Sequence, residues 1–192
     1  MIQITKEELL SRYAAGERNF SAIKFRADSE RRLYKIDLHG ADLRGINLSG
    51  SDLTFTNLRE ANLSGAILSG ATLTQSDLRE ANLEGVIAVG TMLGRSALSL
   101  SSLRDANLTG ASFLQGGCRC ADFTGANMYG VTMAEYNVDG ADFSNVDLEF
   151  ATIIKVDFSK ADVRGFFTFQ QAFFWQVTLP DGVYIEGPLF NP

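Results

Sequence analysis

The chain has 192 residues, of which 45% are hydrophobic and 21% are charged. This composition is typical of a folded globular protein and excludes a largely disordered chain. The net charge of −6 disfavours direct binding to nucleic acid. Apolar runs are short, and no basic flank precedes an apolar stretch at the N-terminus. We therefore expect a cytoplasmic protein that does not bind membranes.

Residues 1–17 are predicted to be an N-terminal capping helix, with the helix itself at residues 5–15. Thr5 and Glu8 have the spacing of a capping box, and Gly16 is typical of a helix C-terminus. Leu9 and Tyr13 share one face of this helix with their apolar neighbours. That face is expected to cover the end of the following domain; a partner-binding helix is the alternative.

A five-residue repeat dominates the rest of the chain. From Leu33 to Val163, every fifth residue is non-polar at 27 consecutive positions, and 16 of these are leucine. The residue two places earlier is usually small, and the residue one place earlier is most often aspartate or asparagine. The two residues that follow are polar or glycine. The repeat therefore predicts one regular structural unit for every five residues.

A period of five fits neither an amphipathic helix nor a flat strand. The small and the large residue lie two apart, so both point inward from an extended segment. Glycine, asparagine and aspartate then form a corner. Four corners close a coil of 20 residues, and the coils stack about 4.8 Å apart. This register predicts that Phe123 lies between Leu103 and Phe143.

The sequences Ala41-Asp42-Leu43-Arg44-Gly45 and Ala141-Asp142-Phe143-Ser144-Asn145 resemble the pentapeptide repeat family, and its cyanobacterial-type members in particular. The resemblance implies an all-β solenoid, a right-handed quadrilateral β-helix, here with a short N-terminal capping α-helix. It covers residues 31–165 and, more weakly, 18–27. We therefore predict a β-helix over residues 18–165. Phe25 and Leu33 are eight residues apart, three more than one repeat, so residues 28–32 are expected to form a loop.

Few residues are suited to catalysis or metal binding. His39, the single histidine, follows an inward leucine and is expected to face solvent. The sequence lacks the motifs of nucleophilic, phosphate-binding or zinc sites, so we expect no enzyme activity, no cofactor and no metal. Cys118 and Cys120 are predicted to point inward and outward, respectively. A local disulfide between them is the alternative, although its small ring would be strained.

Between Ala121 and Ile154 the chain has six acidic residues and no lysine or arginine. We call these six residues the acidic band: Asp122, Glu135, Asp139, Asp142, Asp147 and Glu149. Either they are an ordinary solvated surface, or they form a docking surface for a basic partner.

After Val163 the repeat is expected to end. Residues 166–192 are predicted to be an aromatic C-terminal cap or a dimerisation tail, because aromatic clusters mark contact surfaces. The aromatic residues in question are Phe166, Phe167, Phe169, Phe173, Phe174 and Trp175. The protein would accordingly be a monomer or a C-terminal homodimer.

The sequence favours a non-enzymatic protein-interaction scaffold with an unidentified protein partner. The family resemblance is consistent with this hypothesis, since some cyanobacterial members take part in regulation. It also implies an alternative, a DNA-mimic inhibitor of DNA gyrase. Arginines in the N-terminal coils, such as Arg44 and Arg59, argue against that alternative because they dilute the negative charge.

Overall fold

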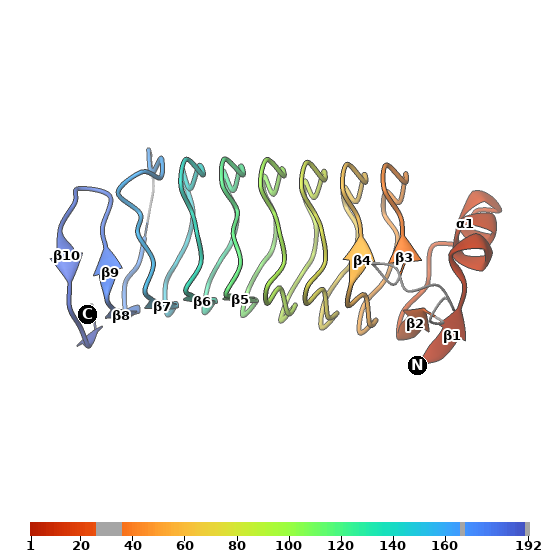
Figure 1. Cartoon of the computed structure of the whole chain (residues 1–192), viewed down its shortest axis with the longest axis horizontal. Coiled ribbons are helices and arrows are strands. Elements are labelled where there is room, and N and C mark those ends of the chain that lie inside the picture. Colours follow the sequence, from red (N-terminus) through yellow and green to blue (C-terminus); the bar gives the residue numbers. More distant parts are fainter. Residues whose placement is uncertain (26–35, 166–167, 191–192) are drawn as a thin grey trace.

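The computed structural model describes residues 1–25, 36–165 and 168–190. The chain forms a row of stacked four-sided coils, with a helix at one end and short antiparallel strands at the other (Figure 1). Equivalent residues of adjacent coils pair in parallel 20 positions apart, as Asn62 does with Asn82 and Asn82 with Ser102. This pairing confirms the predicted β-solenoid.

Each coil has four faces, which we name after one inward residue. The inward residues are Leu43, Leu48, Leu53 and Leu58, and on each face every twentieth residue that follows. The faces follow one another around the coil in this order. The Leu48 and Leu53 faces therefore share a corner, and so do the Leu58 and Leu43 faces.

Corners are formed by tight turns with a left-handed residue. At the first one, the Ala41 N–H donates to the Leu38 carbonyl at 3.1 Å, and Gly40 has φ +64°. This geometry is that of a type II turn, which requires a positive φ at its third residue. Glycine meets the requirement without strain, and this explains its abundance in the sequence.

Regular secondary structure is short. The elements are β1 Ile2–Ile4, α1 Lys6–Ala14, β2 Ile23–Phe25, β3 Ile36–Asp37, β4 Thr56–Asn57, β5 Ser112–Leu114, β6 Thr132–Ala134, β7 Thr152–Ile154, β8 Phe173–Trp175, β9 Val177–Thr178, β10 Tyr184–Ile185 and β11 Leu189–Phe190. Strands β5 to β8 form a parallel sheet on the Leu53 face, and β11 adds to it antiparallel. The Leu53 face is thus the most regular of the four.

The interior is filled by stacked side chains. The rings of Phe123 and Phe143 are parallel, with an interplanar angle of 3° and centroids 4.9 Å apart, as the register predicted. Inward hydroxyl groups bond to backbone carbonyls near the corners; the Ser76 hydroxyl, for example, donates to the Leu53 carbonyl of the preceding coil at 2.7 Å. The core is therefore apolar, and most of its few hydroxyls are hydrogen-bonded.

Helix α1 lies over the first coil, as predicted. Thr5 is its N-cap and accepts a hydrogen bond from the Glu8 N–H at 3.1 Å. Leu9 is completely buried, and the Tyr13 hydroxyl donates to the Arg44 carbonyl at 2.9 Å. In addition, β1 pairs in parallel with β2, so a strand as well as the helix covers this end.

The first coil is longer than predicted. Asn19 pairs with Asn47, and Lys24 with Asp52, over 28 residues rather than 20. Eight residues, not three, are therefore added to this coil, and Phe25 is buried next to the Leu53 position. The predicted loop at residues 28–32 and the first repeat leucine, Leu33, lie outside the described residues.

The solenoid also continues farther than residue 165. Thr152 pairs with Phe173, and Asp157 with Thr178, over 21 residues, so one residue is inserted and the coils then resume. Phe174 and Leu179 take the inward places. The aromatic segment is therefore one more coil. Behind it, β10 pairs antiparallel with β9, and β11 with β8.

Candidate functional site

Charge is divided unequally among the four faces. Most charged residues lie on the Leu43 and Leu58 faces, which share a corner. On the Leu43 face they are Asp42, Arg44, Glu84, Arg104, Asp105, Asp122, Asp142, Asp162 and Arg164. On the Leu58 face they are Asp37, Arg59, Glu60, Asp77, Arg79, Glu80, Arg119, Asp139, Asp157, Lys160 and Asp181. One half of the molecule is therefore densely charged.

The opposite half, formed by the Leu48 and Leu53 faces, has fewer charges, and most of them lie outside its middle coils: Asp52, Glu135, Asp147, Glu149 and Lys155. In the described stretch 67–134, Arg95 is the one charged residue on these two faces. The outward positions there are taken by neutral side chains and glycine. We call them the neutral surface: Ile67, Ser69, Thr72, Thr74, Ile87, Val89, Met92, Gly94, Asn107, Thr109, Ser112, Leu114, Asn127, Tyr129, Thr132 and Ala134.

Large apolar side chains are exposed on the neutral surface and just beyond it. Met92 is 48% exposed and Leu114 39%, and Ile87 and Tyr129 are exposed to a similar extent. Beyond the surface, Phe150 packs its ring against Tyr129, with centroids 5.0 Å apart. Such residues are enriched in the centres of protein interfaces, where charged residues are depleted.

The Leu53 side of the neutral surface is flat. In β5 and β6 the first and third residues point outward, so each strand presents two side chains to solvent. Their partners lie directly above and below in the parallel sheet, as Ser112 does beneath Thr132. A flat wall of uncharged side chains is suited to contact with another protein surface.

Gly94 interrupts this wall. A hollow of about 270 Å³ opens at this residue, between Thr74 in one adjacent coil and Leu114 in the other. Met92 and Ser112 border it on the strand side, and Gln75, Arg95 and Gln115 border it at the corner. We call this hollow the Gly94 notch. A Cβ atom on residue 94 would make only ordinary contacts, the nearest at 3.8 Å, so the notch has room for a side chain.

A polar ladder runs along the corner beside the notch. Nε of Arg95 donates to Oε1 of Gln115 at 3.1 Å, and Nε2 of Gln115 donates to Oε2 of Glu135 at 3.2 Å. Lys155 then donates to Oε1 of Glu135 at 2.9 Å. The hydrogen bond from Lys155 lowers the pKa of Glu135, so this carboxylate is ionised at neutral pH. The ladder thus carries two positive charges and one negative charge.

The acidic band is not gathered on one surface. Its six residues lie on all four faces: Asp122 and Asp142 on the Leu43 face, Asp147 and Glu149 on the Leu48 face, Glu135 at the Leu53 corner and Asp139 on the Leu58 face. Cations of adjacent coils lie beside four of them. The pairs are Asp122 with Arg104 at 2.9 Å, Glu135 with Lys155 at 2.9 Å, Asp139 with Lys160 at 3.4 Å and Asp142 with Arg164 at 3.9 Å. Docking of a basic partner on this band therefore remains a prediction with little geometric support.

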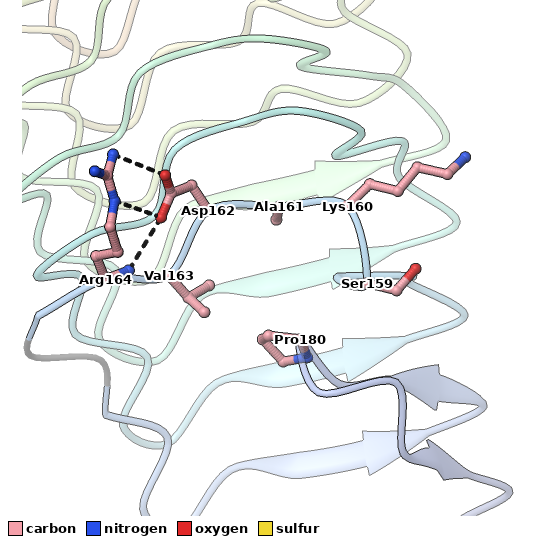
Figure 2. Close-up of a pocket in the computed structure, with 7 residues that line it drawn as sticks. All are labelled: Ser159, Lys160, Ala161, Asp162, Val163, Arg164 and Pro180. Atoms are coloured by element: carbon pink, nitrogen blue, oxygen red, sulfur yellow. Dashed lines mark hydrogen bonds and ion pairs between the residues drawn. The ribbon is translucent and has the colours of Figure 1, made fainter.

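A second hollow, of about 450 Å³, lies at the last coil of the Leu43 face. Figure 2 shows Lys160 and Arg164 at opposite sides of it, with Pro180 facing Val163. Arg164 bonds to Asp162 at 2.7 Å, and Lys160 lies 3.4 Å from Asp139. Both cations have a carboxylate partner already, so this hollow has no uncompensated charge with which to hold an anion.

The predicted aromatic cluster is split by the extra coil. Phe174 points inward and is buried, whereas Trp175 is 46% exposed. Phe169 packs against Phe174 from the adjoining face, and Phe173 contacts Phe190 of the tail, with centroids 5.0 Å apart. Phe166 and Phe167 lie outside the described residues. The described aromatic residues therefore serve both the core and the tail.

Both cysteines are free thiols. Cys118 is buried, and Cys120 is exposed at a corner with φ +54°. The two side chains point to opposite sides of the backbone, so the local disulfide is not formed. Burial raises the pKa of the Cys118 thiol well above its usual range. The thiol in the core is therefore protonated and unreactive.

The remaining polar candidates do not converge. His39 is exposed, as predicted, with Nδ1 2.9 Å from the Arg59 carbonyl oxygen. Among the described residues, no three histidine, cysteine, aspartate or glutamate side chains come together as metal ligands would. In the same part of the chain, no helix has the length and apolar character needed to cross a membrane.

The neutral surface and the Gly94 notch were both missed in the sequence analysis. A signal for the surface was available, because charges sorted with a period of 20 fall on two of the four faces. The acidic band instead came from reading charges along the chain, which mixes all four faces. The notch depends on the side chains above and below Gly94, and the five-residue pattern does not encode these.

Comparison with known proteins supports the fold. The family model for pentapeptide repeats matches residues 32–70, 76–115, 101–135 and 137–166, in eight copies. A trypsin-treated variant of QnrB1, a plasmid-mediated fluoroquinolone resistance protein, is 19% identical, with a TM-score of 0.65 over 81% of this chain and 74% of that chain. HetL, from the cyanobacterium Nostoc and involved in heterocyst differentiation regulation, is 24% identical over 95% and 100%, with a TM-score of 0.41. No curated protein matches in sequence.

Proposed function

The chain belongs to the pentapeptide repeat family, and from this premise we propose that it is a non-enzymatic scaffold that binds a protein partner through the neutral surface. The observation that carries the proposal is the division of charge between the two halves of the solenoid. Over the described residues 67–134, two adjacent faces hold a single charged residue, Arg95.

A solvated solenoid has no physical need for a broad surface with a single charge. Exposed charges keep a protein soluble, and large exposed apolar patches mark contact surfaces. Met92 and Tyr129 on the neutral surface are of residue types that are enriched in protein interfaces. The stacked, hydrogen-bonded coils beneath them restrict their backbone, so a partner would bind without much loss of conformational freedom.

The interior supports a non-enzymatic role. The void beside Ala88, lined by leucines of the core, is about 10 Å³. This is too small to admit a substrate and barely holds one water molecule. The Gly94 notch is open and neutral apart from Arg95, so it lacks the paired acid and base that general acid–base catalysis uses.

The alternative is a DNA-mimic inhibitor of DNA gyrase. QnrB1 is a fluoroquinolone resistance protein, but at 19% identity its likeness to this chain is one of fold. A DNA duplex presents one negative charge for about every 1.7 Å of its axis. Here four of the six acidic-band residues are paired with cations, and the neutral surface covers two faces over residues 67–134. These features favour the scaffold over the mimic.

Site-specific photocrosslinking in cells of the source organism tests the proposal. A photoreactive residue is placed at Thr132 or Thr109 on the neutral surface. The matched control positions are Ser64 on the Leu43 face and Ser99 on the Leu58 face; all four side chains are half-buried. We expect one discrete protein adduct from the neutral positions and none from the controls. Adducts from the charged faces alone would overturn the proposal, and adducts to gyrase there would favour the mimic.

For the C-terminal tail we favour a cap over a dimer interface. Strands β10 and β11 pair with the exposed edges of β9 and β8 and so protect them. We accordingly propose a monomer. Sedimentation equilibrium checks this expectation, because a C-terminal homodimer would have twice the mass of 20.9 kDa.

A further inference from the structure

We propose that the Gly94 notch is the docking site for a peptide segment of the partner in which an apolar side chain stands next to a carboxylate. The apolar side chain enters the notch, and the carboxylate binds Arg95. This inference rests on the proposed function, since it names the partner segment that the neutral surface recognises.

The notch is built for one side chain. Residue 94 lies between Thr74 and Leu114 in the adjacent coils and has no side chain of its own. Gly94 is not in the left-handed region, so the turn does not require glycine here. A Cβ atom at this position would lie 3.8 to 3.9 Å from its neighbours, so larger residues would fit. The space is therefore a local feature of the surface rather than a by-product of turn geometry.

The border of the notch is apolar on one side. Met92 lies on its strand side and Leu114 borders it in the next coil, and both remain substantially exposed. Methionine is flexible and polarizable, which makes it adaptable at binding surfaces. An aliphatic side chain of a partner would bury both residues together. Burial of apolar area of this kind is what anchors a partner residue in a pocket.

Arg95 supplies the second half of the specificity. Its Nε donates to Gln115, but in the described part of the chain no carboxylate pairs with its guanidinium group. Glu135, the nearest acid along the ladder, pairs with Lys155 at 2.9 Å. Arg95 is also the single charged residue on the Leu48 and Leu53 faces within the described residues 67–134. Charge complementarity therefore selects an anionic group, and a guanidinium can hold a carboxylate through two hydrogen bonds.

The two features select one kind of segment. A purely apolar segment would leave Arg95 desolvated and unpaired, which costs free energy. A purely acidic segment would leave Met92 and Leu114 exposed. A leucine followed by an aspartate satisfies both requirements, because the notch and Arg95 are contributed by consecutive residues.

The direct test uses NMR on the isotope-labelled full chain with a defined probe. The probe is the blocked tetrapeptide acetyl-Gly-Leu-Asp-Gly-amide at millimolar concentration. We expect saturable shifts of the Gly94, Arg95 and Leu114 amides and of the Arg95 Nε–H. Replacing leucine by serine, or aspartate by asparagine, in the peptide should each weaken binding by about tenfold. Equal binding of all three peptides, or shifts centred elsewhere, would overturn the inference.

Variants of the protein give an independent readout. Gly94→Leu fills the notch and should abolish the probe shifts, and Arg95→Gln should weaken binding by about tenfold. The matched control is Ser64→Leu, which adds the same side chain at the equivalent repeat position on the Leu43 face, outside the neutral surface, and should leave probe binding unchanged. All three variants should keep the native melting curve, because the altered positions are outside the core. Unchanged probe binding by Gly94→Leu would overturn the inference.

The inference and the proposed function fail in different ways. If the adduct at Thr132 forms equally well in the Gly94→Leu variant, the notch is not the docking point, although the neutral surface still binds a partner. If Gly94→Leu removes the Thr132 adduct and Ser64→Leu does not, the inference is supported. If the neutral positions give no adduct in the unaltered chain, the proposed function is overturned along with the inference.

Discussion

The ring of Tyr136 lies against the backbone of Gly116 in the preceding coil. A Cβ atom on residue 116 would lie 2.6 Å from Cε2 of Tyr136 and 2.5 Å from the Ser96 carbonyl oxygen. Tyr136 occupies a place where the repeat usually has a small residue, and it is 3% exposed. The large side chain is accommodated because the residue one coil away has none, so two exceptions to the repeat compensate each other.

Gly116→Ala should therefore destabilise the solenoid. The added methyl group cannot be placed without moving a ring and a backbone carbonyl, and overpacking of this kind costs about 1–3 kcal/mol. Gly117→Ala is the matched control, because its Cβ atom would be 3.5 Å from the nearest atoms, an ordinary contact. Urea unfolding, followed by circular dichroism, measures the stability of both variants. Equal midpoints for the two variants would contradict this account of the packing.

Substitutions at two corner positions with positive φ should have opposite effects on the stability of the solenoid. Gly65 has φ +65° and open space around it, so Gly65→Ala should cost about 1 kcal/mol through backbone strain alone. Leu100 has φ +63° and is 61% exposed, so Leu100→Gly should relieve strain with little loss of burial. We expect Leu100→Gly to be more stable than Leu100→Ala, which keeps the strain. Melting temperatures of the three variants and of the unaltered chain check both expectations. A Gly65→Ala variant that melts above the unaltered chain would contradict the argument from backbone strain.

The two neighbouring aromatic residues of β8 should behave differently. Phe174 is 3% exposed and Trp175 is 46% exposed. Phe174→Ala should cost about 3–5 kcal/mol, because it leaves a cavity in the last coil. Trp175→Ala should cost less than about 1 kcal/mol, as surface changes usually do. The denaturant midpoints of the two variants measure this difference in stability. A comparable loss of stability in both would show that Phe174 does not point into the core while Trp175 points to solvent.

The two thiols should react at very different rates. Ellman's reagent should label Cys120 in the native protein and Cys118 only after unfolding, since Cys118 is buried. Burial also raises the pKa of Cys118, so folding favours its protonated form. The stability that this provides is complete below the usual thiol pKa of about 8.5 and decreases as the pH rises above it. Cys118→Ala should have a shallower loss of stability between neutral and alkaline pH. Rapid native labelling of two thiols would contradict the register.

The five-residue repeat contained enough information to predict the solenoid from the sequence. Its period excludes a helix face and a flat strand, and the alternation of small, polar and large residues assigns an inside and an outside to each position. The Phe123–Phe143 stack and the solvent-facing His39 follow from this assignment and are confirmed. The capped helix was predictable as well, because Thr5 and Glu8 act locally.

Both ends of the solenoid were harder to predict. Insertions of eight residues near the first coil and of one residue before Thr168 shift the register, and a strict period of five reads such shifts as an end of the repeat. Pairing between coils resumes after the inserted residue, where Thr152 pairs with Phe173. The aromatic segment therefore folds as a coil although it departs from the consensus.

Local periodicity in the sequence by itself determined the coil, its corners and the filling of its core, because each of these depends on residues within five positions of one another. The tertiary structure alone decided which residues are neighbours on the surface. Residues 20 apart lie side by side there, so the acidic band dispersed over four faces, while neutral residues from many coils came together beside Arg95. The surface that we propose to bind a partner results from stacking, which no single repeat contains.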